Sequence, residues 1–199
     1  MPADLLVVGL GNPGDEYAGT RHNVGADTVA LLAARHGGVL KRSSKLKAFT
    51  TDVRIGSVAV ALAFPQTFYN ESGQSVSSLM KWHDIDDPIR LVVVHDELDL
   101  PPGRLKVKVG GGLAGNNGLK SIKSHLHTDG FVRVRIGVGK PPGRMEGADH
   151  VLRRPGKAER AELDVAIEEA ADAVELIATA GADRAMERYN QRDSDDDAD

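Results

Sequence analysis

Three short apolar runs, each ending in turn-forming or polar residues, restrict the folds that this chain can adopt. The runs are Leu5–Leu10, Val58–Phe64 and Ile89–Val94. Runs of this length that are apolar throughout are typical of strands buried on both faces of a sheet, and they are far too short to span a membrane. Because Gly11-Asn12-Pro13-Gly14, Pro65 and His95-Asp96-Glu97 follow them, each predicted strand ends at a defined point.

Segments with a helical spacing of apolar residues alternate with these strands. The predicted helices are Asn23–Ala34, Ser75–Trp82, Asn117–Leu126 and Lys157–Ala180. Two further segments, Arg104–Val109 and Phe131–Ile136, alternate between apolar and basic residues, which predicts strands. This order predicts a single α/β domain, and the alternating strands favour a mixed sheet. We expect a mixed, twisted β-sheet flanked by α-helices over residues 1–191, followed by an acidic, disordered tail at 192–199.

The composition narrows the chemistry and the partners. The 199 residues include no cysteine, which excludes disulfides, a thiol nucleophile and cysteine-based zinc sites. The net charge of −4 argues against a nucleic-acid partner when taken alone, but residues 111–156 carry eight basic and three acidic side chains. A polyanionic partner would therefore meet that segment. The N-terminus shows no secretory signal, so we expect a soluble cytoplasmic protein without a membrane partner.

The pattern Gly9-x-Gly11-x-x-Gly14 formally matches the dinucleotide-binding fingerprint. Three features disfavour this interpretation. Gly14 does not open a helix, Pro13 removes an amide from the loop, and no acid for a ribose stands about 20 residues further on. We instead expect the turn to hold Asn12 at the carboxyl end of the strand, where α/β sheets usually place ligands.

His22 precedes the first predicted helix, where a lone histidine is most often a surface or structural residue. However, it lies shortly after the Asn12 turn, and Asp96 stands at the end of another apolar strand. A histidine held by a carboxylate can act as a general base near neutral pH. The sequence leaves both interpretations open, because it does not show whether His22 and Asp96 meet.

Three asparagines occupy corresponding ends of predicted elements: Asn12, Asn70 and Asn117. Each one, taken singly, is most simply a helix cap or a turn residue. Together with His22 and Asp96 they form a set of uncharged donors and acceptors suited to a peptide or an ester group.

The basic side chains on the two alternating strands also have two interpretations. Arg104, Lys106 and Lys108 share one face of their strand, and Arg133 and Arg135 share one face of theirs. These bases either discourage the association of exposed strands or bind phosphate.

Two other hydrolytic chemistries have little support. His125-x-His127 has only Asp129 as a nearby acid, and no HExxH pattern occurs, which disfavours metal-dependent hydrolysis. No Gly-x-Ser-x-Gly pattern occurs, which disfavours a serine nucleophile.

Several blocks, in one order and spacing, closely resemble bacterial peptidyl-tRNA hydrolase. The blocks are Gly9–Gly14 with Tyr17, Thr20–Gly25, Pro65–Gly73, His95–Pro101, Asn117–Ser121 and Arg133–Gly139. The resemblance covers roughly residues 4–190. It implies hydrolysis of the ester between a peptide and the 3′ ribose of tRNA, which releases tRNA for reuse in translation. It also implies a monomer that needs no metal or cofactor.

Position by position, the resemblance implies a role for each matching polar residue. His22 would be the general base that activates water, and Asp96 would orient it. Asn12 would help to distinguish N-blocked from free aminoacyl groups. Asn70 and Asn117 would hold the peptide and the attacked carbonyl.

The resemblance also implies contacts with the rest of the substrate, peptidyl-tRNA with its acceptor arm and nascent peptide. Tyr17 and Phe68 would line the cleft. Lys108 and Arg135 match the pair that holds the 5′ phosphate of tRNA, which favours phosphate binding for the basic strand faces.

The sequence departs from the family pattern at two positions. Tyr69 stands where methionine is common, and Asn116 stands where a histidine usually precedes the last asparagine. The second departure bears on the geometry near Asn117 rather than on the reaction.

Two other classes of function are a catalytically silent RNA-binding protein and a dinucleotide-dependent oxidoreductase. The joint presence of His22, Asp96 and the asparagines disfavours the silent binder, which would need none of them.

Overall fold

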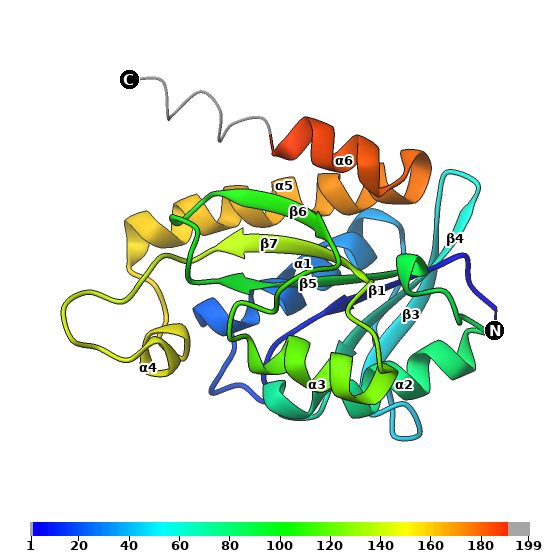
Figure 1. Cartoon of the computed structure of the whole chain (residues 1–199), viewed down its shortest axis with the longest axis horizontal. Coiled ribbons are helices and arrows are strands. Elements are labelled where there is room, and N and C mark those ends of the chain that lie inside the picture. Colours follow the sequence, from blue (N-terminus) through cyan, green and yellow to red (C-terminus); the bar gives the residue numbers. More distant parts are fainter. Residues whose placement is uncertain (1, 191–199) are drawn as a thin grey trace.

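A seven-stranded sheet organises the part of the chain that the computed structural model describes, residues 2–190 (Figure 1). Its strands are β1 (Leu5–Gly9), β2 (Lys41–Ser43), β3 (Ala48–Ile55), β4 (Val58–Pro65), β5 (Leu91–Glu97), β6 (Leu105–Val109) and β7 (Val132–Gly137). Their order in the sheet is β2-β3-β4-β1-β5-β7-β6. The central strands β4, β1, β5 and β7 run parallel, and antiparallel strands flank them on both sides. The predicted mixed sheet is confirmed, whereas the predicted tail at 192–199 lies outside the described residues.

Helices cover both faces of this sheet. They are α1 (Val24–Arg35), α2 (Ser72–Trp82), α3 (Asn117–Leu126), α4 (Gly147–Val151), α5 (Lys157–Ala180) and α6 (Ala182–Tyr189), with short 3-10 turns η1 (Arg21–Asn23), η2 (Tyr69–Glu71) and η3 (Pro88–Arg90). Alternate residues of β1 pack into two cores, Leu5 and Val7 with α1 and α5, and Leu6 and Val8 with α2 and α3. No helix among the described residues is long and apolar enough to cross a membrane.

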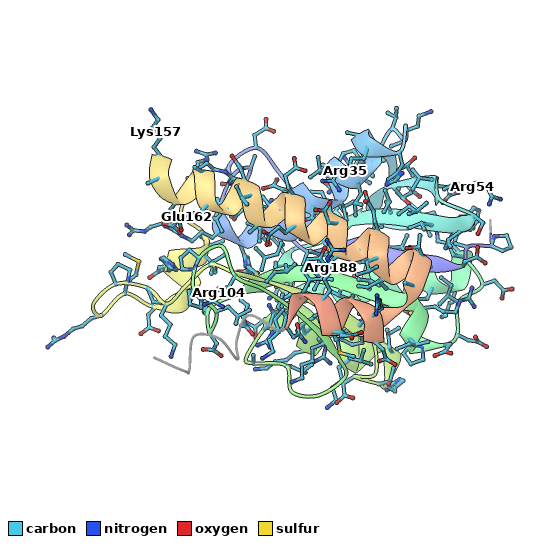
Figure 2. All side chains as sticks on the ribbon, turned by 90° about the horizontal axis from the view of Figure 1, so that it is seen from above. Arg35, Arg54, Arg104, Lys157, Glu162 and Arg188 are labelled. Carbon is cyan, nitrogen blue, oxygen red and sulfur yellow. The ribbon has the colours of Figure 1, made fainter. Side chains whose placement is uncertain are left out.

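Ion pairs fasten α1 to α5 on one of these faces. Arg35 of α1 donates from Nη1 to Asp172 at 2.8 Å and to Glu175 at 3.0 Å, and it also pairs with Glu168. In Figure 2, α5 lies across the molecule beside α6, with Arg35 next to it. These pairs therefore join the C-terminal end of α1 to α5.

The apolar spacing predicted the long helices well and missed two strands. Helices α3 and α5 have the predicted bounds, and α2 begins at Ser72 rather than Ser75. The unpredicted strand β3 mixes threonine, aspartate and arginine with apolar residues, and two residues on one of its faces, Asp52 and Arg54, are exposed. The signal that marks it is Gly56-Ser57, a two-residue connection to β4 with Gly56 at a φ of +61°.

Strand β5 also differs from the prediction. It begins at Leu91 rather than Ile89 and continues through the polar cluster to Glu97. The strand lies between β1 and β7, and its pairing with β7 runs to Glu97 opposite Gly137. His95, Asp96 and Glu97 are therefore buried within the sheet instead of following it in a loop.

Neither interpretation of the basic strand faces fits Arg133, because both require an accessible side chain. The Arg133 residue is 1% exposed, and its guanidinium donates to the carbonyl oxygens of Gly111, Gly112 and Asp129. Strand β6 covers the outer edge of β7, and the glycine-containing loop after β6 supplies two of these carbonyls. Arg133 therefore fixes this loop rather than presenting a free cation.

Strands β1 and β5 and the start of α1 approach so closely that two positions require glycine. A Cβ atom on Gly25 would lie 2.1 Å from the carbonyl oxygen of Val94, and one on Gly9 would lie 2.1 Å from the carbonyl oxygen of Gly25. Gly9, the first glycine of the dinucleotide-like pattern, thus serves helix–strand packing. This packing brings η1, and with it His22, against the end of β5.

Replacing Gly25 by alanine tests this packing. We expect G25A to lower the free energy of unfolding by about 3 kcal/mol, because the new methyl group must displace the backbone of β5. Urea denaturation of G25A beside G112A makes the comparison, since a Cβ on Gly112 meets nothing within 4 Å. Equal urea midpoints for G25A and the unmodified protein would contradict this expectation.

Candidate active site

The carboxyl ends of β4, β1 and β5 meet at one edge of the sheet, because these neighbouring strands run parallel. Asn12 follows β1, Tyr69 and Asn70 follow β4, and Asp96 lies near the end of β5. The turn η1 adds His22 from the start of α1. All five residues line one pocket with a volume of about 630 Å³.

His22 and Asp96 meet at the base of this pocket. The Nδ1 atom of His22 lies 2.9 Å from Oδ2 of Asp96, and the two side chains are 17% and 4% exposed. A carboxylate at this position accepts a hydrogen bond from Nδ1–H, which selects the tautomer with a lone pair on Nε2. Nε2 of His22 can therefore accept a proton from a molecule in the pocket. The Asp96 carboxylate then stabilises the imidazolium that forms.

Tyr69 contacts both members of this pair. Its ring stacks on the ring of His22 with centroids 3.5 Å apart and an interplanar angle of 16°. Its hydroxyl donates to Oδ1 of Asp96 at 2.7 Å and accepts from Nδ2 of Asn116 at 2.8 Å. Burial, to which the charge of Asp96 adds, raises the pKa of the Tyr69 phenol well above its usual range. The hydroxyl therefore stays protonated and remains a donor.

Asn12 joins the loops that follow β1 and β4. Its Oδ1 atom accepts from the backbone N–H of Tyr69 at 2.7 Å. Its backbone N–H donates to Oδ1 of Asn23 at 2.9 Å, and the Asn23 amide donates to the Asn12 carbonyl oxygen at 3.0 Å. With Oδ1 engaged, Nδ2 is the atom through which the Asn12 side chain can donate to a ligand.

The other asparagines and Phe68 lie at the open side of the pocket. Asn70 and Asn117 both line it and are exposed, so their amides are accessible to a bound group. Phe68 is 57% exposed and lines the same pocket, which gives it an apolar surface. Residues from α4 and its C-cap complete the wall: Gly147, Ala148, Val151 and Leu152.

Three residues singled out from the sequence lie outside this pocket. Tyr17 is half-buried in the turn before η1, where its carbonyl oxygen accepts from the Thr20 hydroxyl at 2.7 Å. Lys108 is on β6 and Arg135 is on β7. Arg135 donates from Nε to Glu97 at 2.9 Å, and Glu97 is itself a lining residue. Arg135 thus lies beside the pocket and is already in an ion pair, whereas Lys108 is opposite Arg133 in the register of β6 and β7.

The described lining residues restrict the chemistry. None of them is a serine, threonine, cysteine or lysine, and the contact between His22 and Asp96 is suited to the activation of a water molecule. Within residues 2–190 no group of three or more histidine and carboxylate side chains is arranged to hold a metal ion. The site therefore offers a general base, a carboxylate and several amides.

Sequence reasoning assigned no role to Tyr69 or to Asn23, although both shape the site. In the sequence, Tyr69 stands out only as a departure from the family pattern, and Asn23 only as the start of a predicted helix. One feature of the sequence could have linked Tyr69 to Asn116, its hydrogen-bond partner: Asn116 is the other position that departs from the family pattern. No spacing rule pairs these positions, which are 47 residues apart in the chain.

Arg21, the neighbour of His22, anchors η1 to α5. Its guanidinium donates to both carboxylate oxygens of Glu159 at 2.7 and 2.8 Å. It also donates to the carbonyl oxygens of His150 at 3.1 Å and Arg153 at 3.2 Å. The hydrogen bonds from Arg21 lower the pKa of Glu159, although partial burial opposes this shift. The turn that carries His22 is thus fixed to the first turn of α5.

Comparison with known proteins gives one consistent result. A family model described as "Peptidyl-tRNA hydrolase" matches residues 6–197. A peptidyl-tRNA hydrolase of Frankia alni is 50% identical over 185 residues, 93% of each chain, and one of Cutibacterium acnes is 47% identical over 96% of this chain and 100% of its own. A crystal structure of peptidyl-tRNA hydrolase from Acinetobacter baumannii matches with a TM-score of 0.88 and 39% identity, over 96% of each chain.

The pair between Arg21 and Glu159 leads to a pH-dependent expectation. E159Q lowers the free energy of unfolding at neutral pH by about 1 kcal/mol, since the pair is partly exposed. Because the pKa of Glu159 is lowered in the folded protein, the pair stabilises fully above the usual value of 4.5 and loses this effect as the pH falls through the lowered value.

Thermal unfolding of E159Q and of the unmodified protein, from neutral pH down to about pH 3, measures this difference. E162Q, an exposed change on the same helix, is the matched control (Figure 2). A stability difference for E159Q that stays constant as the pH falls would contradict the assignment.

Proposed function

Because the chain belongs to the peptidyl-tRNA hydrolase family, we propose that it hydrolyses the ester between an N-blocked aminoacyl group and the 3′ ribose of tRNA, with His22 as the general base. The products are a free peptide and a tRNA that can be reused in translation. The observation that carries the assignment of His22 is its 2.9 Å contact with buried Asp96 in this pocket.

The reaction needs one proton to move twice. Nε2 of His22 takes a proton from water while the water oxygen bonds to the ester carbonyl carbon, and Asp96 stabilises the imidazolium. The tetrahedral intermediate then breaks the bond to the 3′ oxygen of the ribose. The imidazolium returns its proton to that oxygen, which leaves a carboxylic acid and a 3′ hydroxyl. General base catalysis of this kind typically contributes about 10²–10⁴-fold.

The amides around His22 hold the acyl part of the substrate. Nδ2 of Asn12 faces a group next to the scissile ester and helps to distinguish blocked from free aminoacyl groups. Asn70 and Asn117, both exposed at the pocket, bind the peptide and the attacked carbonyl. Phe68 covers the nascent peptide with its exposed ring, and Tyr17 extends this cleft.

The tRNA itself binds beside the pocket through its acceptor arm. Lys108 and Arg135 come from neighbouring antiparallel strands and hold the 5′ phosphate. Arg135 must then share its guanidinium between Glu97 and the phosphate. We place the enzyme in the cytoplasm, where translation generates its substrate, and we propose that a monomer suffices because one chain supplies every group named here.

The test of this function is the release of free tRNA from N-acetylaminoacyl-tRNA, measured beside the unblocked aminoacyl-tRNA. We expect cleavage of the blocked substrate only. H22N should lower kcat by about 10²–10⁴-fold, because asparagine keeps a donor for Asp96 but lacks the basic Nε2. H127N, which changes an exposed histidine at the end of α3, is the matched control and should keep its activity.

Nearly full activity of folded H22N would exclude His22 as the base. Absence of cleavage by the unmodified protein, with tRNA still bound, would instead support a silent RNA-binding protein.

Phosphate binding by Lys108 predicts a salt dependence. The logarithm of kcat/KM should fall linearly with the logarithm of salt concentration, because each phosphate contact releases counterions. K108M should lower kcat/KM at low salt and reduce the magnitude of this slope by about 1. The control is K81M, which removes an exposed lysine near the end of α2 remote from the pocket. Identical slopes for K108M and K81M would contradict the role of Lys108.

A further inference from the structure

Tyr69 and Asn116, the two departures from the family pattern, are the two ends of one hydrogen bond. The Asn116 amide donates to the Tyr69 hydroxyl at 2.8 Å, and that hydroxyl donates to Asp96 at 2.7 Å. Asn116, Tyr69 and Asp96 therefore form a hydrogen-bonded network, which ends on the carboxylate that faces His22. Neither the proposed reaction nor the binding of substrate described above uses Tyr69 or Asn116.

The contact with Tyr69 determines how the Asp96 carboxylate can lie. Oδ2 faces Nδ1 of His22 and Oδ1 faces the phenol, so each oxygen has its own donor. A rotation about the Cβ–Cγ bond of Asp96 would weaken both hydrogen bonds at once. Because Asp96 is 4% exposed, water cannot readily replace a lost donor. The phenol thereby fixes the oxygen that orients His22.

The Tyr69 ring is in turn held on two sides. One side stacks on His22 at a centroid distance of 3.5 Å. On the side of α3, Gly118 lies so close that a Cβ atom there would be 2.6 Å from Cε1 of the Tyr69 ring. Asn116 is also the N-cap of α3, where its Oδ1 accepts from the N–H of Leu119 at 3.0 Å. The first turn of α3 and the His22–Asp96 contact are therefore joined through one aromatic residue.

We propose that Tyr69, held by Asn116, is a positioning residue that keeps the Asp96 carboxylate directed at His22 and the imidazole in its reactive plane. The hydroxyl acts on Asp96, the ring acts on His22, and Asn116 polarises the hydroxyl. Tyr69 touches no reacting atom in this scheme. The inference rests on the proposed role of His22 as the base.

Y69F removes the hydroxyl and keeps the ring. We expect kcat for N-acetylaminoacyl-tRNA to fall about tenfold with KM nearly unchanged, because only the orientation of the base is affected. We also expect the Nδ1–H proton resonance of His22 to be lost through faster exchange with water. Y189F, which removes a phenol from the end of α6, is the matched control and should change neither quantity.

Asn116 provides the second variant, which keeps the inference testable if Y69F folds poorly. N116S retains a good N-cap residue for α3 and removes the amide that reaches Tyr69. We expect a two- to threefold fall in kcat, about that of one weakened hydrogen bond. In the Y69F/N116S double variant we expect no fall beyond that of Y69F, because Asn116 acts through the hydroxyl.

The outcomes separate this inference from the proposed function. If the unmodified protein fails to cleave N-acetylaminoacyl-tRNA, the function itself is wrong. If the unmodified protein is active and Y69F keeps both kcat and the Nδ1–H resonance, only the positioning role is wrong. If Y69F lowers the melting temperature alone, Tyr69 is structural and the inference is overturned. If the losses of Y69F and N116S multiply, Asn116 does not act through the Tyr69 hydroxyl, which also overturns the inference.

Discussion

The close approach of β1, β5 and the start of α1 determines where the polar side chains of the pocket lie. Gly9 and Gly25 leave no room for a side chain between these elements. The turn η1 must therefore sit at the end of β5, and this places His22 within hydrogen-bond distance of Asp96. A glycine pattern that resembles a nucleotide-binding loop is thus explained by packing. The packing of the backbone thus sets the position of His22 relative to Asp96.

Burying the Asp96 carboxylate is unfavourable unless donors surround it. The structure supplies one donor to each oxygen, the His22 ring to Oδ2 and the Tyr69 hydroxyl to Oδ1. In return, a carboxylate shielded from water interacts more strongly with an imidazolium than an exposed one does. Burial of the Asp96 carboxylate is therefore unfavourable for stability, but it also makes the carboxylate more effective at orienting and stabilising His22. Water is the nucleophile in the proposed reaction, and the described lining residues include no serine, threonine, cysteine or lysine.

Much of the fold could be predicted because its signals are local. Apolar runs and helical spacing located the parallel strands and the long helices, and the polar residues after those strands located the site. The burial of Arg133 could not be predicted, because alternation on β7 shows which residues share a face but not that the loop after β6 covers one of them. Strand β3 was missed because its exposed face carries polar residues that break the apolar pattern.

The contacts of individual side chains were the least predictable part of the site. The resemblance to a known family supplied roles for His22 and Asp96, and their 2.9 Å contact agrees with those roles. It supplied none for Tyr69, because the family pattern has a different residue there. Its partners come from β5 and from the N-cap of α3, and only tertiary packing brings these elements together.

Whether His22 and Asp96 act as one unit is tested most directly by kcat for H22N, D96N and the double variant on N-acetylaminoacyl-tRNA. If Asp96 acts by orienting and stabilising His22, each single change lowers kcat and the double variant is no slower than H22N, because a base that is absent cannot be oriented. If the two losses multiply in the double variant, Asp96 contributes independently of His22, and the pair is not the unit on which catalysis depends.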